Sequence, residues 1–123
     1  MLEQFENQKY INLETFRKNG EGVKTPVWFV QDRNVLYVWT QADAWKVKRI
    51  RNNDKVKVVP SKVDGEPVGE WVDAHATVDA SEAALSFTKN LMRQKYGLTF
   101  TVFNLMGKLR KSGHTSLKIE LGE

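Results

Sequence analysis

The chain has 123 residues, no cysteine and a formal net charge of +4. This length fits one domain with its own core, and the lack of cysteine excludes a disulfide framework and thiolate chemistry. No apolar run approaches the roughly 18 residues of a membrane span, and no signal-peptide core begins the sequence. We therefore expect one cytoplasmic domain over residues 1–123, whose positive charge favours anionic partners such as nucleic acid, anionic lipid or phosphorylated small molecules.

The first forty residues predict three strands. Ile11, Leu13 and Thr15 alternate with polar residues, and this period of two indicates a strand from residue 10. The glycine-rich stretch NGEGVKTP (19–26) predicts a turn. VWFV (27–30) and VLYVWT (35–40) then follow as two strands separated by the hairpin residues QDRN. Both are apolar on consecutive residues, so we expect both of their faces to be covered.

A short helix and two strands are expected next. The helix runs from Asp43 to Asn53, and a strand over residues 55–60 follows it and ends at Pro60. Residues 70–78 alternate between apolar and polar side chains and predict a further strand.

The last third predicts helices and one closing strand. Ser81 has the character of an N-cap, and apolar residues at spacings of three and four continue to Tyr96, before Gly97 ends the helix. Residues 100–110 favour another helix, and residues 116–121 a final strand. Five or six short strands with few helices indicate a mainly β protein, a closed or partly closed antiparallel barrel.

Motifs of self-contained catalysis are absent from the sequence. His75 and His114 lie far apart without a second ligand at metal-site spacing, so we expect structural or surface roles for them. The sequence contains no G-x-S-x-G elbow, no H-E-x-x-H and no P-loop, and turn glycines account for GEG at residues 20–22. An enzyme of this sequence would take its reactive atom from a cofactor.

A cluster of cations follows the third strand. Lys46 and Arg49 share one side of the expected helix, and Lys48 and Arg51 form a second pair on another side. One pair is thus placed to face a groove while the other stays in water. A solvated basic face and a phosphate site are both open readings. The phosphate site has the better physical rationale, because helix starts and lysines bind anions, and Thr40 adds a hydroxyl donor.

Several segments in order resemble a known family. YINL (10–13), RKNG (17–20), TPVWF (25–29), LYVWT (36–40) and KVKRIR (46–51) resemble the split-barrel flavin- and deazaflavin-binding family related to pyridoxamine 5′-phosphate oxidase. GEWVDAHATV (69–78) and the stretch from residue 91 to 110 are similar to its branch of oxidoreductases that use the deazaflavin coenzyme F-420. The resemblance covers nearly the whole chain.

The resemblance implies a six-stranded antiparallel split barrel of the FMN-binding type. It also implies a homodimer that holds F-420 or FMN in grooves between its subunits. Lys46 and Arg49, with Thr40, match the positions that hold the cofactor phosphate. Trp45 stands where many relatives have a small residue, and the loop QADAW (41–45) lacks the serine often found there.

A second segment matches the positions beside the three-ring system of the cofactor, which it meets mainly through backbone groups. Its members are Lys24, Thr25, Pro26 and Val27. Arg17 stands near a strand end, where it either reaches an anionic group or lies on the surface. Trp28 and Trp39 are expected in the core or at the dimer interface.

The leading hypothesis is therefore an oxidoreductase that uses F-420 or FMN on an unknown small organic substrate. A non-catalytic cofactor carrier on the same fold is one alternative, because fold does not fix function. A nucleic-acid-binding barrel is another, motivated by cations interleaved with aromatic residues. That reading requires aromatic rings exposed on one sheet face, whereas the aromatic residues here sit within apolar runs, so no nucleic acid is expected.

Overall fold

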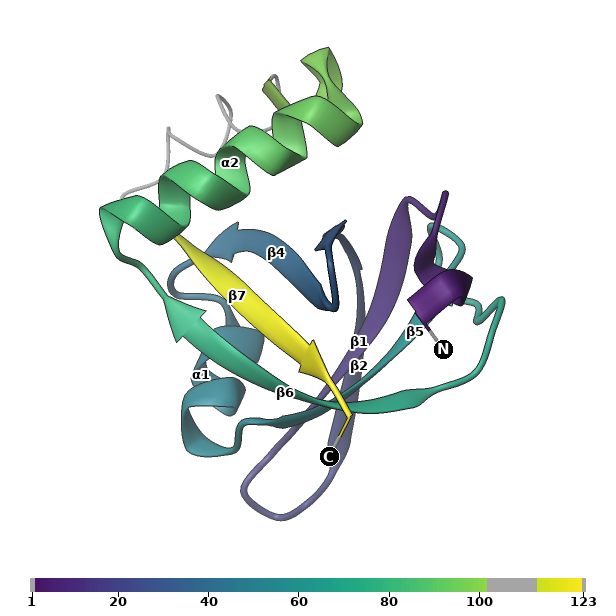
Figure 1. Cartoon of the computed structure of the whole chain (residues 1–123). Coiled ribbons are helices and arrows are strands. Elements are labelled where there is room, and N and C mark those ends of the chain that lie inside the picture. Colours follow the sequence, from purple (N-terminus) through teal and green to yellow (C-terminus); the bar gives the residue numbers. More distant parts are fainter. Residues whose placement is uncertain (1, 102–112, 123) are drawn as a thin grey trace.

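A computed structural model describes residues 2–101 and 113–122. Seven strands form one antiparallel sheet in the order β2-β1-β5-β6-β7-β4-β3, which curls into an open barrel (Figure 1). The strands are β1 Tyr10–Phe16, β2 Gly22–Trp28, β3 Val30–Asp32, β4 Val35–Gln41, β5 Lys55–Ser61, β6 Val72–Asp79 and β7 His114–Leu121. The helices with described bounds are the short 3-10 helix η1 Leu2–Phe5, α1 Trp45–Asn52 and α2 Glu82–Tyr96, and residues 98–101 are also helical.

The barrel interior is built from alternate residues of the strands. Ile11 and Leu13 of β1, Val38 of β4 and Leu117 of β7 are fully buried in one apolar cluster. This alternation is the one that a strand with one face on a core requires. Burial of this apolar surface is the main favourable contribution to the folding free energy of the barrel.

Helix α2 covers the outer face of the sheet. It lies across β4, β7 and β3 (Figure 1), and its end stacks Tyr96 on Trp28 with ring centroids 4.5 Å apart. Past the end of α2, Phe100 meets Trp39 edge-on at 6.1 Å. Aromatic pairs of this kind add to the stability that burial supplies. Both tryptophans thus pack between the sheet and the helical segment above it, and the strands around them are covered on both faces as expected.

The mainly β, split-barrel architecture is confirmed, with seven strands where six were expected. The additional strand arises because residues 27–30, expected as one strand, are divided between β2 and β3. Residues 22–26, expected in a turn, belong to β2, while Phe29 separates β2 from β3. Strand β2 pairs with β1 from Trp28 opposite Tyr10 to Gly22 opposite Phe16. A proline is tolerated here because β2 is an edge strand, where one side of the backbone needs no ladder partner.

The helices follow their expected ends closely. Helix α1 falls within the expected range of residues 43–53. Ser81 caps α2 by accepting a hydrogen bond from the Ala84 N–H at 3.2 Å, and Gly97 ends it with a φ of 61°. Of the helix expected over residues 100–110, nearly all lies outside the described residues. In the described part of the chain, no helix has the length and apolar character to cross a membrane.

Candidate functional site

Helix α1 is anchored to the barrel by two residues and presents cations beside them. Val47 and Ile50 enter the buried core, and the helix packs against β1 and β6. Lys46 and Arg49 each precede an anchoring residue, which leaves them at the flank of the helix and half-buried. The other two cations of the helix are exposed. This is the division that a spacing of three predicts.

The half-buried pair has little to neutralise it. The Nε–H of Arg49 donates a 2.7 Å hydrogen bond to the Thr15 hydroxyl on β1. Burial, followed by the nearby charge of Arg49, lowers the pKa of Lys46. Burial and the charge of Arg17 lower the pKa of Arg49 in the same way. Within residues 2–101 and 113–122, neither Lys46 nor Arg49 forms an ion pair with a carboxylate. Two adjacent, partly desolvated cations that lack a carboxylate partner in the described structure form a site that an anion would stabilise.

Arg17 is held at the edge of this site. It follows β1, and its guanidinium pairs with the Glu21 carboxylate at 2.6 Å in an exposed position. Exposed pairs of this kind contribute little stability. Arg17 therefore adds positive potential near Arg49, while its own close partner is a carboxylate.

Thr40, the third residue predicted to hold the phosphate, lies near the end of β4. It is buried on β4 opposite Thr115 of β7, and it lines a hollow of about 410 Å³ with Tyr10 and Trp39. The described hydrogen bonds join Arg49 to Thr15, and none of them joins Thr40 to the cations. Thr15 was missed as a site residue, although its inward position in the alternating pattern just before Arg17 was a usable signal.

The segment of residues 24–27 lies directly alongside β1 and is divided between two faces. Thr25 and Val27 pair with Leu13 and Ile11, on the face that also carries Thr15. Lys24 lies on the opposite face, where its ammonium stands 5.3 Å from the centroid of the Trp71 ring.

Because β2 ends the sheet order, one side of its backbone has no strand partner among the described residues. Pro26 and Lys24 are residues that discourage another strand from pairing with such an edge. The backbone groups on that side of β2 are therefore not used by any described strand.

Trp45, at the start of α1, belongs to the exposed side of the helix. Its side chain is 70% exposed, and the Lys48 ammonium lies 4.4 Å from its ring centroid. A cation–π contact of this kind contributes about 0.5–1 kcal/mol at an exposed site. Trp45 therefore lies with the exposed cation Lys48. Its large apolar ring is exposed to solvent and directly precedes Lys46 in the sequence.

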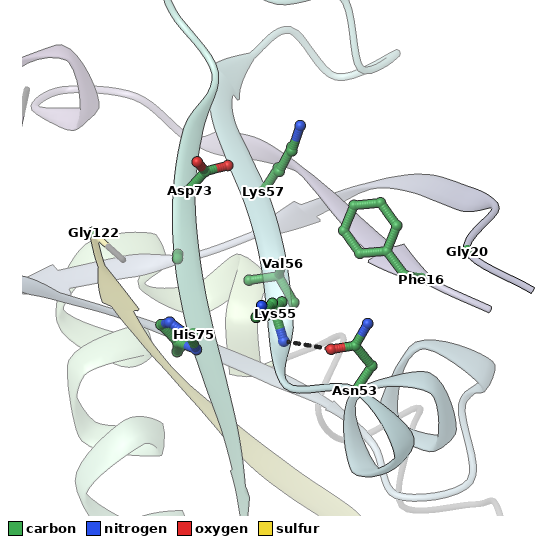
Figure 2. A pocket seen from close by; sticks show the side chains of 10 residues that line it. Phe16, Gly20, Asn53, Lys55, Val56, Lys57, Asp73, His75 and Gly122 are labelled. Carbon is green, nitrogen blue, oxygen red and sulfur yellow. Dashed lines mark hydrogen bonds between the residues drawn. The ribbon is translucent and has the colours of Figure 1, made fainter. Parts of the chain in front are cut away.

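A second hollow lies on the outer face of β5 and β6 and contains none of the predicted site residues (Figure 2). Its volume is about 600 Å³. Lys57 stands opposite Asp73 across the two strands, and the His75 ring lies 3.7 Å from the Asp54 carboxylate. Opposite charges therefore already face one another there. The described residues hold no group of three or more metal-ligating side chains. The cation pair on α1 differs from this hollow in lacking carboxylate partners among the described residues.

Comparison with known proteins identifies the fold. No protein-family model matches the chain, and no curated protein matches it. Among solved structures, HutZ, the heme storage protein from Vibrio cholerae, superposes with a TM-score of 0.74 at 16% identity, over 99% of this chain and 87% of HutZ. A candidate pyridoxamine 5′-phosphate oxidase from Listeria innocua gives a TM-score of 0.68 at 14% identity, over 99% of this chain and 90% of that one.

An F420 reductase superposes with a TM-score of 0.64 at 16% identity, over 98% of this chain and 92% of that protein. Identities this low establish a shared fold and leave the ligand to be argued from the site. The chain therefore has the split-barrel fold of proteins related to pyridoxamine 5′-phosphate oxidase, as the order of its sequence segments implied.

Proposed function

We propose that the protein binds F-420 or FMN and acts as an oxidoreductase on a small organic substrate. One observation carries this proposal: Lys46 and Arg49 are half-buried, adjacent and without a carboxylate partner in the described residues. Both cofactors carry a phosphate close to a planar three-ring system. An anion at this pair would offset the cost of holding two desolvated like charges together.

The roles of the chain's own residues follow from their geometry. Arg49 uses its Nε–H on Thr15, which orients the guanidinium and leaves the terminal N–H groups for an anion. Lys46 would supply a second, mobile charge to the same phosphate. The unpaired edge of β2 would lie along the ring and offer it backbone groups. The bound cofactor would supply the hydride chemistry.

A homodimer belongs to the same proposal. The exposed ring of Trp45 beside the cations is a surface that a second subunit would cover. Sedimentation velocity, followed at the visible absorbance of the cofactor, tests binding and assembly together. We expect cofactor absorbance to move with a species of twice the 14.2 kDa chain mass. Absorbance that stays behind the protein would contradict cofactor binding, and cofactor moving with a 14.2 kDa species would contradict the dimer alone.

The fold of an F420 reductase supports F-420 as one of the two cofactors. The fold of a heme storage protein supports a carrier as the second candidate function. The two functions separate in one experiment from which oxygen is excluded, because oxygen itself oxidises reduced FMN. When substrate is added, an oxidoreductase oxidises its reduced cofactor and a carrier leaves it reduced. A screen of small organic acceptors against the reduced, loaded protein makes this comparison.

Nucleic-acid binding has less support. Trp28 packs on Tyr96, and Trp39 packs against Phe100. Stacking of bases requires aromatic faces that are open to the nucleic acid, whereas these rings already face the helical segment above the sheet. Absence of binding to single-stranded oligonucleotides at physiological salt is the expected result.

Cofactor affinity should fall at alkaline pH because of Lys46. Its pKa is lowered, so its charge is lost at a lower pH than that of an ordinary lysine, and the attraction for phosphate is lost with it. We expect titrations between about pH 7 and 10 to show this decline, and the Lys46→Arg variant to lack it, since arginine stays charged. An equal decline in both proteins would assign the effect to another group.

A further inference from the structure

A lysine far from α1 has unusual surroundings. Lys95, in the last turn of α2, places its Nζ 2.8 Å from the Phe29 carbonyl oxygen and 3.7 Å from the centroid of the Phe29 ring. The ring of Tyr96 lies 5.2 Å away. The residue is exposed overall and lines a hollow of about 440 Å³ between α2, β3 and the turn after η1.

In the part of the chain that the structure describes, no carboxylate pairs with this ammonium. Glu6 and Asp32 line the same hollow, yet within the described residues Lys95 forms no ion pair with either. Its close partners are one backbone carbonyl and two ring faces, which stabilise a charge less than a carboxylate does. Burial lowers the pKa of Lys95 to about 8. A larger share of this amine is therefore neutral near physiological pH than of an ordinary lysine.

The surroundings also hold the side chain in place. The Tyr96 hydroxyl accepts the Phe29 N–H at 3.1 Å and lies 2.6 Å from the carbonyl oxygens of Lys9 and Phe29. These contacts fasten the end of α2 to the residue between β2 and β3. The amine of Lys95 therefore lies in an open hollow, and the backbone beside it is tied through Tyr96 to the backbone of Lys9 and Phe29.

We propose that Lys95 is a reactive amine that is acylated by activated acyl donors such as esters, thioesters and acyl phosphates. Its Nζ lone pair attacks the carbonyl carbon of the donor, and a C–N bond forms. The bond from that carbon to the leaving oxygen or sulfur breaks, the leaving group departs with the electron pair, and Nζ releases one proton to solvent. The product is a neutral amide, which suits a position that disfavours charge and retains one N–H for the Phe29 carbonyl.

The expected rate difference follows from the neutral fractions. At pH 7.5 an amine with a pKa of about 8 is roughly one quarter neutral, against about one part in a thousand for an ordinary lysine. Nucleophilicity falls with basicity, by the dependence measured for thiols, and this removes part of the gain. Acylation of Lys95 should therefore be about 10- to 20-fold faster than that of an ordinary lysine.

The test uses the whole protein with substoichiometric p-nitrophenyl acetate, a neutral donor that the cations of α1 do not attract. Peptide mass spectrometry gives the acetylation rate at each lysine. The comparison lysines are Lys57, opposite Asp73, and Lys62, whose ammonium is 3.5 Å from the Glu66 carboxylate. We expect Lys95 to react about tenfold faster than either at pH 7.5 and its rate to level off above about pH 8.5.

A variant pair gives a second readout. With excess donor, the fast phase of nitrophenol release from the wild-type protein should include one equivalent from Lys95, in addition to the α-amino group, whose ordinary pKa is also about 8. Lys95→Arg should lose this one equivalent, while Lys62→Arg should retain it. A Lys95 rate equal to those of Lys57 and Lys62, or a fast phase of unchanged amplitude in Lys95→Arg, would overturn the proposal.

Discussion

Replacement of Lys46 by alanine is expected to weaken the binding of F-420 or FMN about 10- to 150-fold. This range corresponds to the roughly 1.5–3 kcal/mol of a hydrogen bond to a charged group. The loss should be large because Lys46 is half-buried and one of only two cations at the site that lack a carboxylate partner in the described structure. Equilibrium fluorescence titration of the purified variant against both cofactors measures the loss.

Lys48 supplies the matched control. It lies on the same helix with the same charge, but it is exposed and stacks on Trp45. Lys48→Ala should therefore change the affinity by about twofold or less, since exposed charges are screened by solvent and salt. Equal losses in the two variants would show that the cofactor is attracted by diffuse positive charge and that no specific phosphate clamp exists.

Replacement of Ile50 by alanine is expected to lower the free energy of unfolding by about 2–5 kcal/mol. Ile50 is 3% exposed and packs in the main apolar cluster. The substitution removes buried methylene groups and leaves a cavity under α1. Urea unfolding at equilibrium, followed by tryptophan fluorescence, measures the change.

Ile50→Val is the control for this prediction, with an expected loss of about 0.5–1.5 kcal/mol. It keeps α1 seated, so its cofactor affinity should match that of the wild-type protein. A cost below about 1 kcal/mol for Ile50→Ala would mean that α1 is not anchored by this residue. The account of how Lys46 and Arg49 are held at the barrel wall would then fail.

Local sequence patterns predicted most helices and strands, because the signals that mark these elements come from residues close together in the sequence. Alternation marked β1, and the Ser81 cap and Gly97 marked the ends of α2. The first part of β2 was missed because Gly22 and Pro26 have the composition of a turn. Only pairing with β1 makes this segment a strand, and only its edge position makes the proline acceptable. Neither fact is local.

The placement of the proposed site residues in the fold was also predictable only in part. The spacing of Lys46 and Arg49 placed them together on one side of a helix, and their half-buried state agrees with it. Thr15, the partner of Arg49, lies 34 positions away, so it required the packing of α1 on β1. Lys24 and Thr25 point to opposite faces of any strand, but the register of β2 on β1 decides that Thr25 is the one on the side of Leu13. Long-range pairing, which composition and periodicity do not encode directly, decides these contacts.

The measurement that tests the central claim most directly is a parallel titration of the cofactor-free protein with F-420, FMN and heme at two salt concentrations. Saturable binding of F-420 or FMN that weakens at higher salt and is impaired in Lys46→Ala is the predicted result. Binding of heme alone would contradict the flavin-type cofactor and favour a carrier. Binding of none of the three would contradict the proposal that this pair of cations holds a cofactor phosphate.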